Sequence, residues 1–187
     1  LGKALSLPQP IIALHLTRPP IVIPDRKSLG IPSHFEAARG AYIMRDFRDD
    51  LPHMGTVIVS GTSSTHNVVQ VLKELDQREI NVRIVAAPSY DLFRLQPEEY
   101  RERVLPFSRW MDSMTITNGA RRLMHDWLAN KVAEEYSLSA DWDNQWRGGG
   151  SLDTVIEDAH LSPEWILEGI MRFARERDQR LRRLGMM

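Results

Sequence analysis

Apolar and polar residues follow two different periods along the middle of the chain. Residues 56–59 and 82–86 are short apolar runs rich in β-branched side chains, which is typical of buried strands. Between them, apolar residues recur every three or four positions, as on one face of a helix: Val68, Val69, Val71, Leu72 and Leu75. A strand, a helix and a strand in this order form a parallel βαβ unit, whose sheet needs cover on both faces. The pattern predicts an α/β layer fold.

Further strands extend this unit. Residues 41–46 are amphipathic enough to form an edge strand, and residues 114–117 are predicted to be a third parallel strand. We therefore expect a three-layer α/β/α domain around a mixed, mostly parallel sheet with one antiparallel edge strand. Residues 11–16 also predict a strand, but no other part of the chain is expected to pair with it. We expect this strand to be frayed, swapped or paired with another molecule.

Helix signals mark the second half of the chain. Pro97 and the two glutamates after it open a short helix that Pro106 ends. Ser162, Pro163 and Glu164 supply a hydroxyl N-cap, a proline at the first helical position and an early acid, which together begin a longer helix.

Three segments are predicted with less regular structure. Residues 120–128 are a helical stretch with these residues on one face: Leu123, Met124, Trp127 and Leu128. Residues 137–150 predict an irregular loop in which Trp142 and Trp146 are buried as anchors. The arginine-rich tail, residues 175–183, is interpreted as a helix extending into solvent, because acids interrupt its arginines and no aromatic residues are interleaved with them.

Composition excludes several classes of protein. The 187 residues are enough for one domain with a sizeable core. The formal net charge is −1, so no strong field attracts the chain to nucleic acid or to an anionic membrane. No apolar run approaches the roughly 18 residues of a membrane span. Without cysteine, the chain forms neither disulfides nor thiolate metal sites, and this fits a cytoplasmic protein.

The turn between the strand at residues 56–59 and the following helix is the best candidate for chemistry. It consists of Gly61, Thr62, Ser63, Ser64, Thr65 and His66. A strand-to-helix turn at the carboxyl edge of a sheet presents free N–H groups and the positive end of a helix dipole, which suits an anion or an effector. The alternative is structural: Ser63, Ser64 or Thr65 only caps the helix. No Gly-Lys-Ser/Thr follows, so the turn is not a P-loop.

Other catalytic and metal sites are not expected. The histidines show no i,i+4 pair and no carboxylate that completes a ligand set: His15, His34, His53, His66, His125 and His160. No Gly-x-Ser-x-Gly elbow is present. We therefore predict no catalytic, cofactor-binding or metal-binding residue in this chain.

The βαβ unit also carries a family resemblance. Residues 56–59, the Gly-Thr-Ser turn, the helix and residues 81–85 resemble the C-terminal domain of transketolases. The residues that follow resemble the Phe…Gln…Tyr…Val-Leu-Pro signature of that family: Phe93, Gln96, Tyr100, Val104, Leu105 and Pro106. Upstream, residues 13–18 resemble the end of the middle domain of these enzymes, and residues 38–43 resemble the Gly-Ala-Tyr strand of the next segment. The resemblance covers about residues 11–107.

The resemblance implies that the parent chain transfers a two-carbon ketol unit between sugar phosphates, using thiamine diphosphate and Mg²⁺. In that family the first domain holds the cofactor through a Gly-Asp-Gly…Asn motif, and the second supplies a glutamate. Neither segment is present here, since Gly148, Gly149 and Gly150 lack the aspartate. We expect a fragment that is inactive alone, with residues 37–187 as the C-terminal domain and residues 1–36 as the end of a preceding domain and a proline-rich linker.

Partners and alternatives follow from the same resemblance. The preceding domains of the parent chain and a second copy in a homodimer are the expected partners, and neither nucleic acid nor a membrane is. Deoxyxylulose-phosphate synthase and the 2-oxo acid dehydrogenase β subunit share this domain, so another thiamine diphosphate enzyme is an alternative. A non-enzymatic module that binds an anion at the turn of residues 61–65 is a second alternative.

Overall fold

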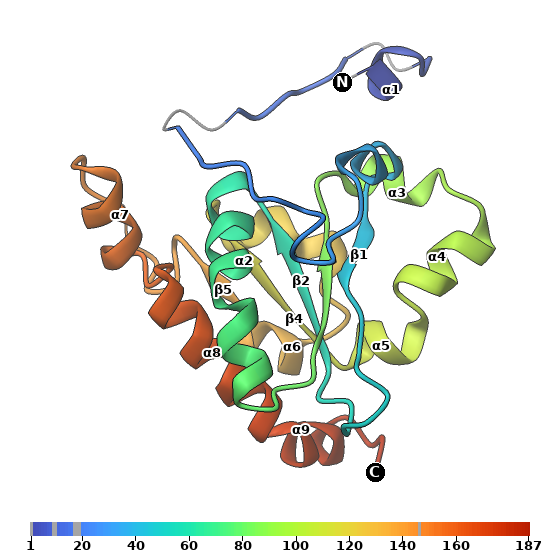
Figure 1. The fold of residues 1–187 in the computed structure, drawn as a ribbon, viewed down its shortest axis with the longest axis vertical. Helices are drawn as coiled ribbons and strands as arrows, with labels where there is room; N and C mark the ends of the chain where they lie inside the picture. Colours follow the sequence, from blue (N-terminus) through green and yellow to red (C-terminus); the bar gives the residue numbers. More distant parts are fainter. Residues whose placement is uncertain (1, 9–10, 17–19, 146) are drawn as a thin grey trace.

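The computed structural model describes residues 2–8, 11–16, 20–145 and 147–187 (Figure 1). Its sheet has the strand order β1-β3-β2-β4-β5. The strands are β1 (Tyr42–Arg45), β2 (Thr56–Ser60), β3 (Arg83–Ala86), β4 (Ser113–Thr117) and β5 (Leu138–Ser139). β1 runs antiparallel to β3, and the other neighbouring pairs are parallel. The predicted mixed sheet with an antiparallel edge strand is confirmed.

Short helices connect and cover these strands. In chain order they are α1 (Gly2–Leu5), η1 (His34–Arg39), α2 (Thr62–Gln77), α3 (Tyr90–Arg94), α4 (Glu98–Val104), α5 (Phe107–Met111), η2 (Arg121–Trp127), α6 (Lys131–Tyr136), α7 (Leu152–Asp158), α8 (Pro163–Arg175) and α9 (Arg177–Arg183). The short helix after Pro97 and the long helix after Ser162 begin where the sequence predicts them.

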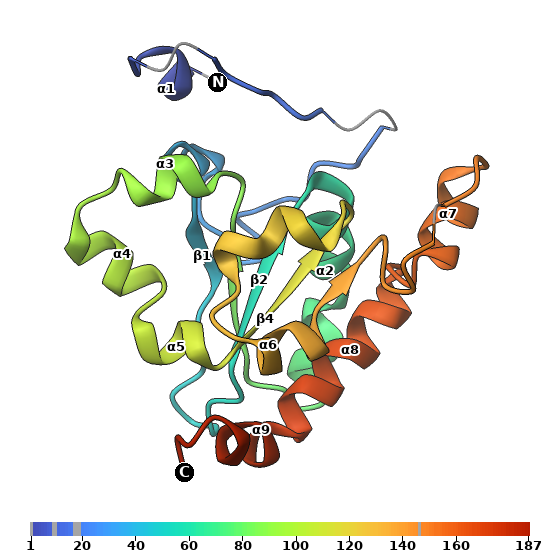
Figure 2. The same cartoon turned by 180° about the vertical axis from the view of Figure 1, so that it is seen from behind.

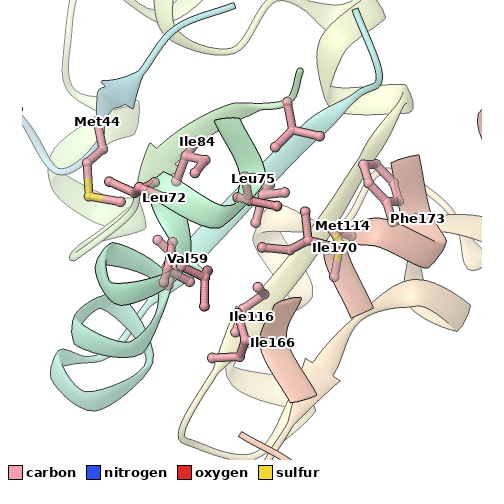
Figure 3. Packing of buried hydrophobic residues seen from close by; sticks show 14 of the residues in the cluster. Met44, Val59, Leu72, Leu75, Ile84, Met114, Ile116, Ile166, Ile170 and Phe173 are labelled. Atoms are coloured by element: carbon pink, nitrogen blue, oxygen red, sulfur yellow. The ribbon is translucent and has the colours of Figure 1, made fainter. Parts of the chain in front are cut away.

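Helices lie on both faces of the sheet, as Figures 1 and 2 show from opposite sides. Alternate residues of each strand point to opposite faces, so Val57 and Val59 pack under α2 and α8 while Ile58 packs under α3, α4 and η2. In Figure 3, Leu72 and Leu75 of α2 meet side chains of α8 and of the strands in one continuous core. The predicted three-layer α/β/α arrangement is therefore confirmed.

The N-terminal segment, expected to be frayed, swapped or paired with another molecule, forms no strand in the structure. Residues 11–16 have no regular secondary structure, and they lie beyond η1 and α3 at one end of the molecule (Figures 1 and 2). The predicted strand is not formed because no described segment hydrogen-bonds along it, and a strand needs such a neighbour. Leu1, residues 9–10, residues 17–19 and Trp146 lie outside the described residues, so two of the residues in the segment 13–18 are not described.

Two segments after β4 also need correction. Residues 121–127 form the 3₁₀ helix η2, in which Met124 and Trp127 are buried but Leu123 is 63% exposed. The predicted loop at 137–150 begins with β5, whose Leu138 pairs with Ile116 of β4. Trp142 is not a buried anchor, because 45% of its surface is exposed and it stacks on His160 at a ring distance of 4.2 Å.

The largest correction concerns the C-terminal tail. The chain breaks its helix at Glu176 and continues as α9, and Arg180 in α9 has no exposed surface. Its Nε and Nη2 donate to Oδ1 of Asp112 at 2.9 and 2.7 Å, and its Nη1 donates to the carbonyl of Phe173. Arg177 donates to the other oxygen of Asp112 at 2.7 Å. The tail is therefore folded against the sheet rather than extended into solvent.

This ion pair connects segments that are far apart in the sequence. Asp112 precedes β4, and its carbonyl accepts a hydrogen bond from the amide of Thr56 at the start of β2. The guanidinium of Arg180 lies 3.6 Å from the ring centroid of Phe173 in α8, an arrangement that favours a cation. Gly55 passes so close that an added Cβ would lie 2.6 Å from that ring. The amino ends of β2 and β4, the end of α8 and α9 thus meet at one buried carboxylate.

Replacing Asp112 with alanine should destabilise the fold strongly, because it leaves the buried guanidinium of Arg180 without a counter-ion. We expect a loss of about 3–5 kcal/mol in the free energy of unfolding, measured by urea denaturation. Arg183→Ala is the control, because its ion pair with Glu135 is solvent-exposed and should be worth less than about 1 kcal/mol. Equal losses in the two variants would contradict a structural role for the buried pair.

Candidate functional site

The candidate turn lies where β2 ends and α2 begins, at the carboxyl end of the central strand. Gly61 is the N-cap residue, with φ 97°, and no side chain caps the helix. Ser64 instead donates to Oδ1 of Asn118 at 3.4 Å, and Thr65 donates to the carbonyl of Gly61 at 2.7 Å. The predicted hydroxyl cap is therefore wrong, and the first N–H groups of α2 are not capped by a side chain.

The backbone conformation at position 61 favours glycine. Its positive φ belongs to the region that side chains disfavour. An added Cβ would also lie 1.8 Å from Oδ1 of Asn118, which follows β4. The start of α2 and the end of β4 therefore approach each other closely. The connection after β2 leads to β3 on one side of it, and the next connection leads to β4 on the other side. In open α/β sheets, ligands usually bind beyond the carboxyl ends of the strands at such a topological switch point.

A cavity of about 340 Å³ opens on one side of this turn. Gly61, Thr62, Thr65 and His66 line it, together with apolar side chains of the sheet and of α2 and with residues 21–24. Arg26 also lines it, and its Nη1 donates to the carbonyl of Pro32 and the hydroxyl of Tyr42. Among the described residues that form its wall there is no aspartate or glutamate. The charged groups of this cavity thus favour an anion.

A different cavity, of about 480 Å³, lies on the other side of α2. Ser63 and His66 line it from the turn, and Ser162 and Pro163 line it from the start of α8. His66 borders both cavities, and its Nε2 lies 2.6 Å from the amide nitrogen of Gln70. The six residues that the sequence groups together thus face different surroundings, because successive residues of a helix turn by about 100°.

A cluster that the sequence did not indicate lies at the opposite end of the sheet. Phe47 stacks on His53 at a ring distance of 4.0 Å, and the guanidinium groups of Arg83 and Arg109 lie 5.2 and 4.6 Å from the Phe47 ring. Nη2 of Arg109 donates to Nδ1 of His53 at 2.8 Å. A guanidinium only donates hydrogen bonds, so this contact requires the unprotonated nitrogen of His53. These residues come from three separate segments, the loop between β1 and β2, strand β3 and helix α5, so no single sequence motif contains them.

The described residues include no group of three or more histidine, aspartate or glutamate side chains arranged to hold a metal ion. None of the helices in the described ranges is both long and apolar enough to cross a membrane.

The arginines around His53 give a prediction for the pH dependence of stability. Burial, and then the charges of Arg109, Arg83 and Arg177, lower the pKa of His53 below its usual range, against a smaller opposite effect of Asp46. Between the unfolded pKa of about 6.5 and this lower folded pKa, the unfolded chain binds more protons. The contribution of His53 therefore lowers the free energy of unfolding as the pH falls through that window.

Arg109→Ala should raise the pKa of His53, which a nuclear magnetic resonance titration of the imidazole would measure. Arg101→Ala is a matched control, because Arg101 is an exposed arginine of the nearby helix α4. An identical His53 pKa in both variants would show that Arg109 does not set it.

Comparison with known proteins shows which family this chain resembles. The family model described as the transketolase-like TK C-terminal domain matches residues 40–141. Transketolase 2 of Escherichia coli is 37% identical over 73 residues, which are 38% of this chain and 10% of that protein. The probable transketolase of Streptococcus pneumoniae is 28% identical over 130 residues, which are 70% of this chain and 16% of that protein. The chain thus matches less than a fifth of the length of these relatives.

The structure of the transketolase from Leishmania mexicana resembles this chain with a TM-score of 0.55 and 24% identity. The similarity covers 78% of this chain and 19% of that chain. At this level of identity the likeness concerns the fold, and it extends beyond the part of the chain that the family model matches.

Proposed function

This chain belongs to the family of transketolase-like C-terminal domains, and we propose that it acts as the C-terminal domain of a transferase that moves a two-carbon ketol unit between sugar phosphates. The match over residues 40–141 is the observation that carries this proposal. The parent enzyme would depend on thiamine diphosphate and Mg²⁺. Residues 1–36 would be the end of a preceding domain and a linker, and residues 37–187 the domain itself. We also propose that the parent enzyme acts in the cytoplasm.

The residues of this chain do not fit the cofactor. Within the described ranges no acidic or histidine cluster suits its metal ion, and the glycines at residues 148–150 lack the aspartate of the family motif. We therefore assign no step of the transfer to this chain. Its proposed contributions are packing against the preceding domains, contacts in a homodimer and binding of an effector. Another thiamine diphosphate enzyme of the same superfamily is the alternative for the parent.

A ketol-transfer assay with thiamine diphosphate and Mg²⁺ tests the first proposal. The 187-residue chain should be inactive, because it lacks cofactor-binding segments, and the full gene product that contains it should be active. Assays of the full product with the substrates of the related thiamine enzymes serve as the comparison. Activity of the chain alone would overturn the assignment of catalysis to other segments. A full product without ketol-transfer activity would contradict the proposed transketolase-type function.

We also propose that the turn at the start of α2 binds an anionic effector in the cavity beside Arg26. The support is the combination of uncapped N–H groups, a nearby guanidinium and a wall without carboxylates among the described residues. The apolar wall formed by Met44 and Val69 would contact an uncharged part of the ligand. A non-enzymatic anion-binding module would use the same turn, so this proposal does not depend on the activity of the parent.

Titration with inorganic phosphate tests this site. We expect the amide resonances of Gly61 and Thr62, which line this cavity, to shift saturably, and Arg26→Ala to weaken binding about tenfold, the usual effect of losing one charge-assisted hydrogen bond. Lys27→Ala is the matched control, since Lys27 is an exposed neighbouring cation that is absent from the cavity wall. Unshifted amides, or equal effects of the two substitutions, would contradict the proposal.

A further inference from the structure

Arg26 is held in the wall of the 340 Å³ cavity with part of its guanidinium unused. Its Nη1 donates to the carbonyl of Pro32 at 3.0 Å and to the hydroxyl of Tyr42, a buried residue of β1, at 3.2 Å. Within the described ranges, neither Nε nor Nη2 of Arg26 has an acceptor. Two neighbouring donors of a guanidinium can bind both oxygens of one carboxylate. The fixed guanidinium therefore has an edge that suits a carboxylate ligand.

The carboxylate next to Arg26 in the sequence does not occupy this edge. Asp25 is exposed, and its Oδ1 accepts hydrogen bonds from the amides of Lys27 and Ser28 at 3.1 and 3.3 Å. Neither Asp25 nor Lys27 is among the described residues that line the cavity. In that part of the wall, Arg26 is the one side chain with a permanent charge. The complementary ligand therefore carries a single negative charge.

Aliphatic side chains that line the same cavity are open to solvent. Val22 and Ile23 line it, and 77% and 86% of their surfaces are exposed. Val69 of α2 also lines it and is only partly buried. Covering exposed aliphatic surface is favourable, and an apolar hollow with a few polar groups is typical of a ligand site. This wall is suited to an aliphatic group of the ligand.

The size and polarity of the cavity restrict the ligand further. A volume of about 340 Å³ is near the lower end of the usual range for small-molecule pockets, about 300–1,000 Å³. A ligand with many hydroxyl groups would lose hydrogen bonds to water against the aliphatic side chains, and this loss costs free energy. A short alkyl chain has no such groups to desolvate. The cavity thus favours a small ligand with one charged end and one apolar end.

We propose that this cavity binds a short aliphatic monocarboxylate, with its carboxylate on Nε and Nη2 of Arg26 and its chain against Val22, Ile23 and Val69. The inference rests on the proposed anion site beside Arg26 and names the class of ligand that this site takes. It assigns the site to a ligand with one charge and an apolar body, and not to a phosphorylated sugar.

Calorimetric titration of the 187-residue chain with acetate, butyrate and hexanoate tests the proposal. The affinity should rise about two- to fourfold for each added methylene, up to the value for a fully buried one. Adipate has the same chain length as hexanoate and a second carboxylate, which would lie against a wall without a second cation. It should therefore bind at least about tenfold more weakly than hexanoate.

Three outcomes would overturn this inference: no binding of the carboxylates, equal affinities of acetate and hexanoate, or adipate binding as tightly as hexanoate. The phosphate titration then separates the two proposals. If phosphate still shifts the amide resonances of Gly61 and Thr62, the anion site stands and the ligand class is wrong. If phosphate shifts neither amide, the anion site itself is wrong.

Substitutions test the two ends of the site separately. Val69→Thr keeps the shape of the side chain and adds a hydroxyl group to the apolar wall, so it should weaken hexanoate binding about three- to tenfold and leave phosphate binding unchanged. Val132→Thr is the matched control, because Val132 of α6 is also a partly buried helix valine but is not among the described residues that line the cavity.

Arg26→Ala should weaken acetate and hexanoate by the same factor, about tenfold, because it removes the charged contact and leaves the apolar wall. Lys27→Ala should change neither affinity. Equal effects of Val69→Thr and Val132→Thr on hexanoate, or an unchanged affinity for hexanoate in Arg26→Ala, would contradict the assigned position of the ligand. The thermal unfolding midpoint of each variant shows whether a lost affinity reflects a lost fold.

Discussion

The buried contact between Asp112 and Arg180 is the constraint on which the rest of the arrangement depends. A guanidinium removed from water is tolerated only when its charge and its donors are satisfied, and here a carboxylate, two carbonyl groups and an aromatic ring do so. These partners fix the amino ends of β2 and β4 relative to the end of α8. Because α8 is held there, its opposite end lies beside the first turn of α2, where both cavities open.

Much of the fold follows from the sequence because its signals are local. The strands β2 and β3 lie in short apolar runs, β4 alternates apolar residues with serine and threonine, and α2 and α8 carry one apolar face each, so short-range periodicity locates them. β5 consists of two residues and is a strand only because β4 is beside it. The same limitation applies to Arg180: nothing in an arginine-rich tail identifies the one side chain that a distant aspartate draws into the core.

The candidate site was predictable in position but not in surroundings. A Gly-Thr-Ser turn after a buried strand indicates a helix start at the carboxyl edge of a sheet, and the turn lies there. Its walls come from segments up to about a hundred residues away, including the proline-rich stretch and the start of α8. Ser-Pro-Glu predicts a hydroxyl that caps its helix, but the buried Oγ of Ser162 has no hydrogen-bond partner among the described residues.

One wall of both cavities is formed by the same short piece of chain. Ile21 and Val22 line the cavity beside Arg26 and the cavity beside Ser162, and this piece connects the domain to residues 11–16 beyond it. A ligand in either cavity therefore contacts residues that also form the wall of the other cavity. Occupancy of the cavities and the position of the connecting segment are then thermodynamically linked, so each alters the other by the same free energy.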